Sequence, residues 1–98
     1  MWHGLFQDSS AYIFNINSDV KQPAIEAAEA GFDVWLGNSR GNIYSSNHQN
    51  YNDPFDKEHK KAFWDFSWAD IGRYDLPVVI EFVKNMTKQE KMAYVGYS

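Results

Sequence analysis

The stretch Lys91-Met92-Ala93-Tyr94-Val95-Gly96-Tyr97-Ser98 joins an apolar, β-prone run to a glycine, a variable residue and a serine. A Gly-x-Ser triplet after a strand is half of the pattern Gly-x-Ser-x-Gly. In that pattern small residues allow a sharp turn from strand into helix, and the serine hydroxyl stands exposed above a sheet. We therefore predict a strand over Lys91 to Gly96 and a nucleophilic role for Ser98. The triplet alone is common, so the upstream sequence has to support this interpretation.

The upstream sequence alternates between helical and β-prone segments. Pro23 opens and Gly31 closes an alanine-rich run, which predicts a short helix with proline in its first turn. Phe32 to Leu36 is a short β-prone run that ends at a glycine, so we predict a strand there. Residues Ser39 to Asp56 are rich in Asn, Ser, Gly and Tyr and predict a long loop.

Residues Ser67 to Thr87 form the second helical region. Ser67 and Asp70 resemble a capping box at its start. Pro77 interrupts the region, so we expect either a kink or two helical pieces, the main one beginning near Pro77. The apolar stripe of this helix consists of Val79, Phe82, Val83 and Met86. The order helix, strand, loop, helix, strand predicts the α/β class, with a mostly parallel sheet and crossover helices.

The composition is that of one folded domain at most. The chain has 98 residues, and a hydrophobic fraction of 44% argues against disorder. The net charge of -4 gives no basic excess, so no nucleic-acid partner is expected. No run approaches the roughly 20 apolar residues that span a bilayer, so no transmembrane segment is predicted. The absence of cysteine excludes disulfides and thiolate metal sites but does not fix the compartment.

Five blocks of sequence carry a resemblance to a known family. They are His3-Gly4-Leu5-Phe6-Gln7, Gly31 to Asn42, Phe63 to Trp68, Tyr74 to Pro77, and Tyr94 to Ser98. In order and spacing these blocks resemble the acid lipase family of α/β hydrolases, which includes gastric and lysosomal acid lipases. The chain is thereby identified as a partial member that ends at the nucleophile serine. Residues 1–98 would form part of one α/β-hydrolase (lipase) domain, from the oxyanion loop to the nucleophile elbow.

The resemblance implies a serine ester hydrolase of lipid catabolism, which cleaves triacylglycerols, cholesteryl esters or related acyl esters through an acyl-enzyme. It implies that Ser98 is the nucleophile and that the backbone N–H of Leu5 is one of two oxyanion donors. It also places His3 and Gly4 beside the substrate. The partners implied are a lipid ester and a transient lipid–water interface, and the location implied is secreted or lysosomal. No cofactor and no metal site are expected.

The acid and the histidine of the triad are not found among these residues. In α/β hydrolases both follow the nucleophile in the chain, whereas His3, His48 and His59 all precede Ser98. A serine hydroxyl without a base is a poor nucleophile at neutral pH, so we expect the 98 residues alone to be inactive. Two alternatives stay open. The chain is a non-catalytic remnant with at most a binding role, or it belongs to a hydrolase of the same fold that acts on thioesters or peptides.

Several residues have competing interpretations. For His3 we favour a structural role, holding the oxyanion loop by hydrogen bonds, over a substrate contact. For Arg40 we favour a loop anchor over binding of a substrate carboxylate. His59 is expected on a solvated face. Tyr97 stands where histidine is common in the family, a departure that bears on substrate or pH preference. Packing in a core is favoured over a lipid-facing patch for the aromatic cluster of Phe63, Trp64, Phe66 and Trp68.

Overall fold

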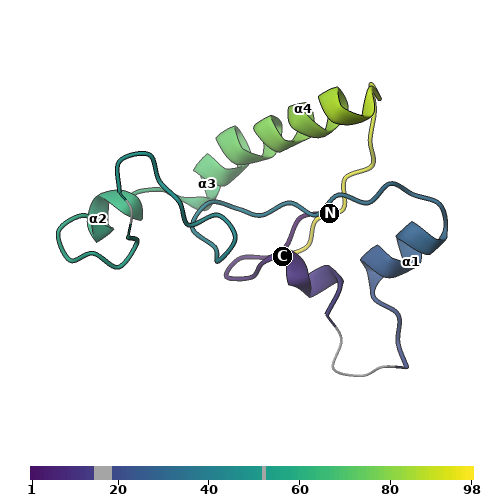
Figure 1. Cartoon of the computed structure of the whole chain (residues 1–98), viewed down its shortest axis with the longest axis horizontal. Helices are drawn as coiled ribbons and strands as arrows, with labels where there is room; N and C mark the ends of the chain where they lie inside the picture. The colour runs from purple at the N-terminus through teal and green to yellow at the C-terminus, as the bar shows by residue number, and fades with distance from the viewer. Residues whose placement is uncertain (15–18, 52) are drawn as a thin grey trace.

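The computed structural model describes residues 1–14, 19–51 and 53–98, and the regular elements of this part are helical. In chain order they are the 3-10 turn η1 (Ser9–Tyr12), α1 (Pro23–Glu29), α2 (Lys60–Phe63), α3 (Trp68–Asp70), the π-helical η2 (Ile71–Asp75) and α4 (Leu76–Thr87). Figure 1 shows α3 leading into the long helix α4, with α1 and α2 at opposite ends of the molecule. None of the described helices combines the length and apolar character needed to cross a membrane.

The predicted helices are confirmed, and their ends follow from the sequence. Helix α1 starts at Pro23, and Gly31 just beyond it has a φ of +95°, a conformation that glycine adopts at little cost. The Asp70 carboxylate accepts a hydrogen bond from the Ser67 N–H at 2.8 Å, as a capping box requires. A π-helical turn ends where α4 begins, and Pro77 lies in the first turn of α4. The helical region is therefore interrupted at the expected place.

The predicted α/β fold with a mostly parallel sheet is wrong for the described residues. Residues 32–36 and 91–95 are not strands, and the described part of the chain holds two isolated parallel bridges, Trp2 with Gly37 and Trp2 with Gly96. A parallel ladder needs several consecutive residues in its central strand. Here the pairing on both sides is confined to Trp2, and the backbone turns at residues 5–6, so no ladder forms in the described residues.

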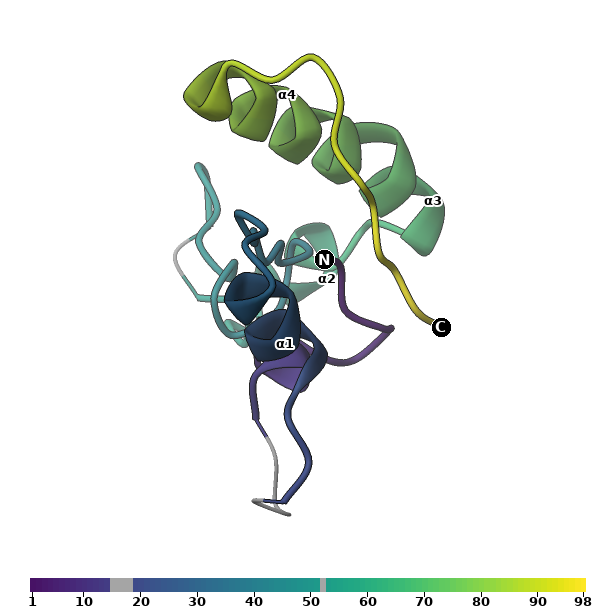
Figure 2. The ribbon, with the colours of Figure 1, turned by 90° about the vertical axis from the view of Figure 1, so that its right-hand side faces the viewer.

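Trp2 nevertheless ties distant segments together. Its backbone N–H donates to the Val95 carbonyl at 2.7 Å, and its indole N–H donates to the Ser39 hydroxyl at 3.0 Å. Its own carbonyl accepts a hydrogen bond from the Tyr12 hydroxyl at 2.8 Å. The indole also covers Gly37, where a Cβ would lie 2.4 Å from a ring carbon. Trp2 is 8% exposed. Figure 2 shows the C-terminal segment running from the end of α4 back toward the N-terminus.

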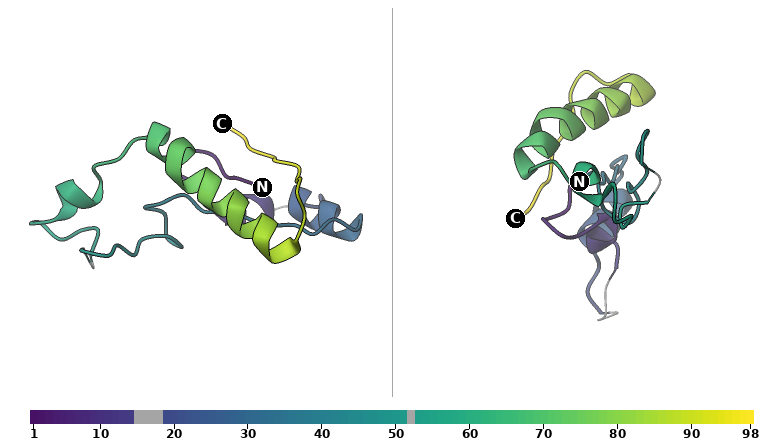
Figure 3. Two further views of the ribbon diagram at one scale, coloured as in Figure 1. Left: turned by 90° about the horizontal axis from the view of Figure 1, so that it is seen from above. Right: turned by 90° about the vertical axis from the view of Figure 1, so that its left-hand side faces the viewer.

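The buried core is small. The buried hydrophobic residues in the described part of the chain are Trp2, Tyr12, Ala24, Phe63 and Val83. The radius of gyration over Cα atoms is 15.4 Å, compared with about 13 Å for a compact domain of this length. Figure 3 shows α4 crossing the rest of the chain when seen from above. An apolar hollow of about 900 Å³ lies between α4 and the extended residues 32–36 and 91–95.

We predict that the isolated 98 residues unfold without a sharp transition. So few apolar side chains are buried that their transfer free energy does not offset the conformational entropy lost on ordering the chain. Circular dichroism during heating, together with sedimentation of the same sample, measures this behaviour. A cooperative thermal transition from a soluble monomer would contradict the prediction.

Candidate active site

Ser98 has a positive backbone φ angle. Its φ is +55°, in the left-handed region that residues other than glycine rarely adopt, and its side chain is exposed. The residues before it, 91–95, are extended and exposed. The Gly-x-Ser pattern expects a serine in a strained turn after a strand. Here the φ of Ser98 is positive, and the residues before it are extended without forming a strand.

The loop from His3 to Gln7 packs directly against this serine. A Cβ placed on Gly4 would lie 3.2 Å from the Ser98 Cβ and 3.3 Å from the Tyr97 carbonyl oxygen. The Gln7 N–H donates to the Gly4 carbonyl at 3.2 Å and closes a turn. Glycine is therefore the residue that lets this loop approach the serine closely.

Leu5 follows Gly4 in the turn and is largely exposed. In the described part of the chain, no group accepts a hydrogen bond from the Leu5 backbone N–H. Phe6, the next residue, has a φ of +63° and is 98% exposed. The tip of this loop thus presents a backbone donor and an aromatic ring to solvent beside Ser98.

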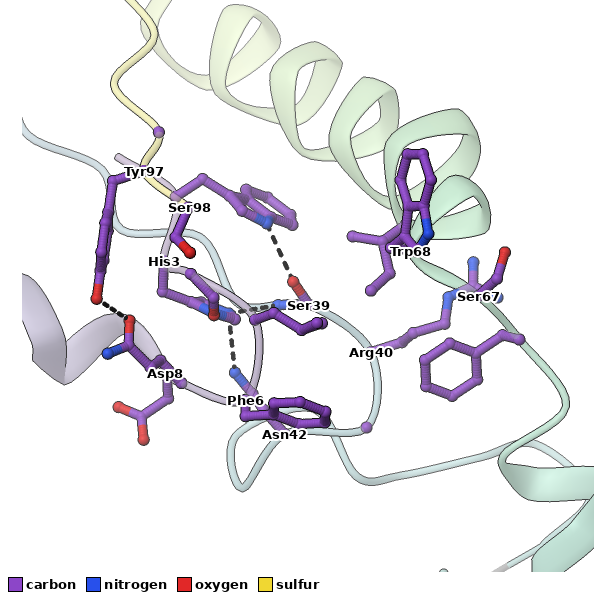
Figure 4. Close-up of a pocket in the computed structure, with 18 of the residues that line it drawn as sticks. His3, Phe6, Asp8, Ser39, Arg40, Asn42, Ser67, Trp68, Tyr97 and Ser98 are labelled. Atoms are coloured by element: carbon purple, nitrogen blue, oxygen red, sulfur yellow. Dashed lines mark hydrogen bonds between the residues drawn. The ribbon is translucent and has the colours of Figure 1, made fainter.

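His3 lies beneath the loop and is 7% exposed. Its Nε2 accepts a hydrogen bond from the Ser39 backbone N–H at 3.0 Å and lies 3.2 Å from the Asn42 side-chain nitrogen. Because Nε2 accepts, the proton is assigned to Nδ1, which donates to the Gly4 carbonyl at 2.8 Å. Figure 4 shows the dashed contacts from Ser39 and Asn42 that meet at the His3 ring. Both ring nitrogens are occupied by bonds that hold the loop.

Arg40 fixes the neighbouring loop to the start of α4. Its Nε donates to Asp75 Oδ1 at 2.7 Å, and its backbone N–H donates to Asp75 Oδ2 at 2.9 Å. The guanidinium carbon lies 5.6 Å from the centre of the Phe66 ring and 5.9 Å from that of Tyr74. The hydrogen bond with Asp75 raises the pKa of Arg40. The predicted loop anchor is confirmed.

We predict that Arg40→Met destabilises the whole protein by about 1–2 kcal/mol. The change leaves the Asp75 carboxylate without its charged partner, and the partial exposure of Arg40 keeps the cost moderate. Chemical denaturation measures the loss. Arg73→Met is the matched control, because Arg73 lies exposed on η2. Equal losses in the two variants would contradict the role of the Arg40–Asp75 pair.

A cavity of about 950 Å³ opens beside Ser98. Apolar and aromatic side chains from the loop of residues 3–7, the Arg40 loop and α3 line it, and Figure 4 shows Phe6 and Trp68 among them. Its size lies within the range of small-molecule sites. The predicted core packing of the aromatic cluster holds for Phe63, which is buried. It is wrong for Trp64 and Trp68, which are 42% and 78% exposed.

The remaining titratable side chains form no further centre in the described ranges. No group of three His, Cys, Asp or Glu side chains comes together there in a way that could hold a metal ion. His59 lies 2.6 Å from Asp56 and is half-exposed, so its predicted solvated position is confirmed. The hydrogen bond from His59 lowers the pKa of Asp56.

Sequence reasoning did not single out Ser39, Asn42 or Gln7. Ser39 and Asn42 hold His3, and Gln7 accepts a hydrogen bond from the Tyr97 hydroxyl. The signal for the first two was the Asn- and Ser-rich turn around Arg40, a composition that favours local side-chain hydrogen bonds. No local signal identifies Gln7, because its partner lies 90 positions away.

The chain is similar over its full length to curated lipases. It is 44% identical to the lysosomal acid lipase/cholesteryl ester hydrolase of Homo sapiens over 97 residues, which cover 98% of this chain and 22% of that protein. It is 43% identical to lipase lipl-1 of Caenorhabditis elegans over 98 residues, or 100% of this chain and 22% of that protein. It is 44% identical to lipase member M of Mus musculus over 96 residues, or 98% of this chain and 21% of that protein.

Other comparisons give no match. No family model matches the chain, and no solved structure matches it significantly. The similarity to the lipases covers nearly every residue of the chain, and the chain spans about a fifth of their length. Over its whole length the chain is therefore homologous to one part of these lipases.

Proposed function

We propose that this chain supplies the nucleophile and one oxyanion donor of a serine ester hydrolase of lipid degradation. Ser98 is the nucleophile, and the Leu5 backbone N–H is the donor. The observation that carries the proposal is the close packing of Gly4 on Ser98. A Cβ placed on Gly4 would lie 3.2 Å from the Ser98 Cβ. Two further observations support the proposal: Leu5 and Ser98 both line one cavity, and within the described residues the Leu5 N–H donates no hydrogen bond.

The proposed reaction is acyl transfer through the serine. The Ser98 oxygen attacks the ester carbonyl carbon as its proton passes to a base, and negative charge develops on the carbonyl oxygen. The Leu5 N–H stabilises that charge. The C–O bond of the ester then breaks, and the alcohol leaves with a proton. Water attacks the acyl-enzyme in the same way, which releases the fatty acid and restores the Ser98 hydroxyl.

The base is not one of the three histidines of this chain. His3 already accepts the Ser39 N–H at Nε2, so it cannot take the serine proton there. His48 and His59 pack on either side of Tyr51, in the loop region that leads into α2. We propose that the base and its acidic partner belong to residues outside these 98, which correspond to about a fifth of the relatives' length. Residues 1–98 are then part of the catalytic domain.

Triacylglycerols and cholesteryl esters are the proposed substrates. The cavity beside Ser98 is lined by aromatic and aliphatic side chains, among them Trp64, Trp68 and Ile71, which suit an acyl chain. The name of the human relative includes cholesteryl ester hydrolase, which supports the choice of a sterol ester. The exposed Phe6 and Trp68 suit a transient contact with a lipid–water interface.

The test uses the whole protein that carries this chain. It is assayed on emulsified triacylglycerol, a cholesteryl ester, an acyl thioester and a peptide amide, and it is labelled with a fluorophosphonate whose position is mapped by mass spectrometry. We expect ester hydrolysis and a label on Ser98. Activity confined to the thioester or the amide would refute the lipase assignment. A label on a different serine would refute the nucleophile, and the absence of both label and turnover would favour a non-catalytic remnant.

A further inference from the structure

We infer that Tyr97 is a positioning residue, which holds the oxyanion loop at its working distance from the nucleophile through a hydrogen bond to Gln7. The inference rests on the proposed roles of Ser98 and Leu5. It assigns a task to the tyrosine next to the serine, a residue that takes no part in the bond-making steps.

The hydrogen bond joins the two halves of the proposed site. The Tyr97 hydroxyl donates to Gln7 Oε1 at 2.5 Å, across 90 positions of sequence. Tyr97 directly precedes Ser98, and Gln7 follows Leu5 by two residues. The same Gln7 oxygen lies 3.0 Å from the position of a Cβ on Gly4, beside the Gly4–Ser98 contact. The bond therefore links the segment that carries Ser98 to the loop that carries Gly4 and Leu5.

The Tyr97 ring is itself held in place by a fixed neighbour. It packs edge-to-face with Tyr12, with 6.4 Å between ring centres and 90° between ring planes. Tyr12 is buried, and its hydroxyl donates to the Trp2 carbonyl at 2.8 Å. Because the Tyr12 hydroxyl is bonded to the Trp2 backbone, the Tyr12 ring restricts the orientation of the Tyr97 ring. This contact directs the Tyr97 hydroxyl toward Gln7.

The oxyanion loop depends on this hydrogen bond because residues 5–7, at its tip, are not packed against other side chains in a core. Leu5, Phe6 and Gln7 are all exposed, and Phe6 has the unfavourable left-handed conformation. Within the described residues, the turn is held by the Gln7–Gly4 backbone bond, by the His3–Gly4 bond at its base and by the Tyr97–Gln7 bond, and of these three the Tyr97–Gln7 bond reaches the segment that carries Ser98. Loss of the Tyr97–Gln7 bond therefore allows the Leu5 N–H to move relative to the serine. A small displacement of a donor from the reacting carbonyl lowers the rate of the chemical step.

The experiment removes the hydroxyl alone, in the whole protein. Tyr97→Phe is expected to lower kcat for a soluble short-chain ester about fivefold with KM unchanged, the effect of one neutral hydrogen bond. Gln7→Leu is expected to give a similar loss, and the double variant is expected to lose no more than either single change. Tyr44→Phe, at an exposed tyrosine outside the cavity, is the matched control with wild-type kcat. Wild-type kcat in Tyr97→Phe, or independent losses that multiply in the double variant, would overturn the inference.

A stability measurement separates this inference from the proposed function. If the whole protein hydrolyses no ester, or if Ser98 takes no fluorophosphonate label, the proposed function falls. The Tyr97–Gln7 bond is then tested by the melting temperatures of wild type, Tyr97→Phe, Gln7→Leu and the double variant, whose shifts should be non-additive. Additive shifts would overturn the bond itself. If the enzyme is active and the melting-temperature shifts are non-additive, but Tyr97→Phe has the kcat of wild type, the positioning role would be overturned.

Discussion

Ser98→Ala in the whole protein is expected to lower kcat for ester hydrolysis on the order of 10⁴-fold or more. Alanine has no oxygen to form the acyl-enzyme, so the residual rate would come from binding and oxyanion stabilisation alone. The melting temperature should stay the same, because the Ser98 side chain is exposed and its hydroxyl makes no hydrogen bond within the described residues. The assay compares kcat on an emulsified triacylglycerol with the circular dichroism spectrum and melting curve of each protein.

Ser46→Ala is the matched control for this change. Ser46 lies in the long loop and does not line the cavity beside Ser98, so its removal should leave kcat and the fluorophosphonate label intact. Turnover retained by Ser98→Ala would show that the nucleophile is a different residue. A collapse of the folded state in that variant would make the loss of activity uninformative, so the melting curve is read first.

The second large effect is expected from Gly4→Val, with kcat lowered about 10²- to 10³-fold. A Cβ at this position meets the Gln7 oxygen at 3.0 Å, the Ser98 Cβ at 3.2 Å and the Tyr97 carbonyl oxygen at 3.3 Å, and valine adds two methyl groups beyond it. The loop must therefore separate from the serine, and the Leu5 N–H moves with it. Serine reactivity toward the small fluorophosphonate should fall in parallel, because this reaction also develops charge on an oxygen at the donor.

Gly72→Val provides the control for Gly4→Val. Gly72 lies in η2 with no atom within 4 Å of its added Cβ, so the same substitution there meets open space. It should leave kcat unchanged. Gly4→Ala, with a single methyl group, should lie between wild type and Gly4→Val. Wild-type kcat in Gly4→Val would rule out Leu5 as the oxyanion donor, since the donor could then not depend on the close approach of the loop.

The sequence predicts those features whose causes are local. Pro23 and Gly31 bracket α1, Asp70 caps α3, and Pro77 marks the start of α4, because each depends on residues within one or two helical turns. The anchoring role of Arg40 was also predictable, because the planar guanidinium binds carboxylates well and Arg40 lies in a polar turn. The resemblance assigns Gly4 to the substrate and Ser98 to the nucleophile, and these two residues lie next to each other in the structure.

The features that sequence reasoning missed depend on partners far along the chain. Residues 32–36 have the composition of a strand, but a parallel strand exists only if consecutive residues of a neighbour pair with it. Trp2 offers a single bridging position on each side. Trp68 was expected in a core, yet the small number of buried residues around it leaves it exposed at the cavity. The short helix α2 (Lys60–Phe63) was not predicted, because a single turn of helix carries no periodic signal.

The double bridge at Trp2 bears on how such a protein is made. Translation proceeds at about 5–20 residues per second, so Val95 is synthesised roughly 5–20 seconds after Trp2. Throughout that interval the backbone N–H of Trp2 lacks its final acceptor, whereas Gly37 and Ser39, which contact the indole, are already synthesised. The hydrogen bond from Trp2 to Val95 therefore forms only after the segment that leads to Ser98 has been synthesised.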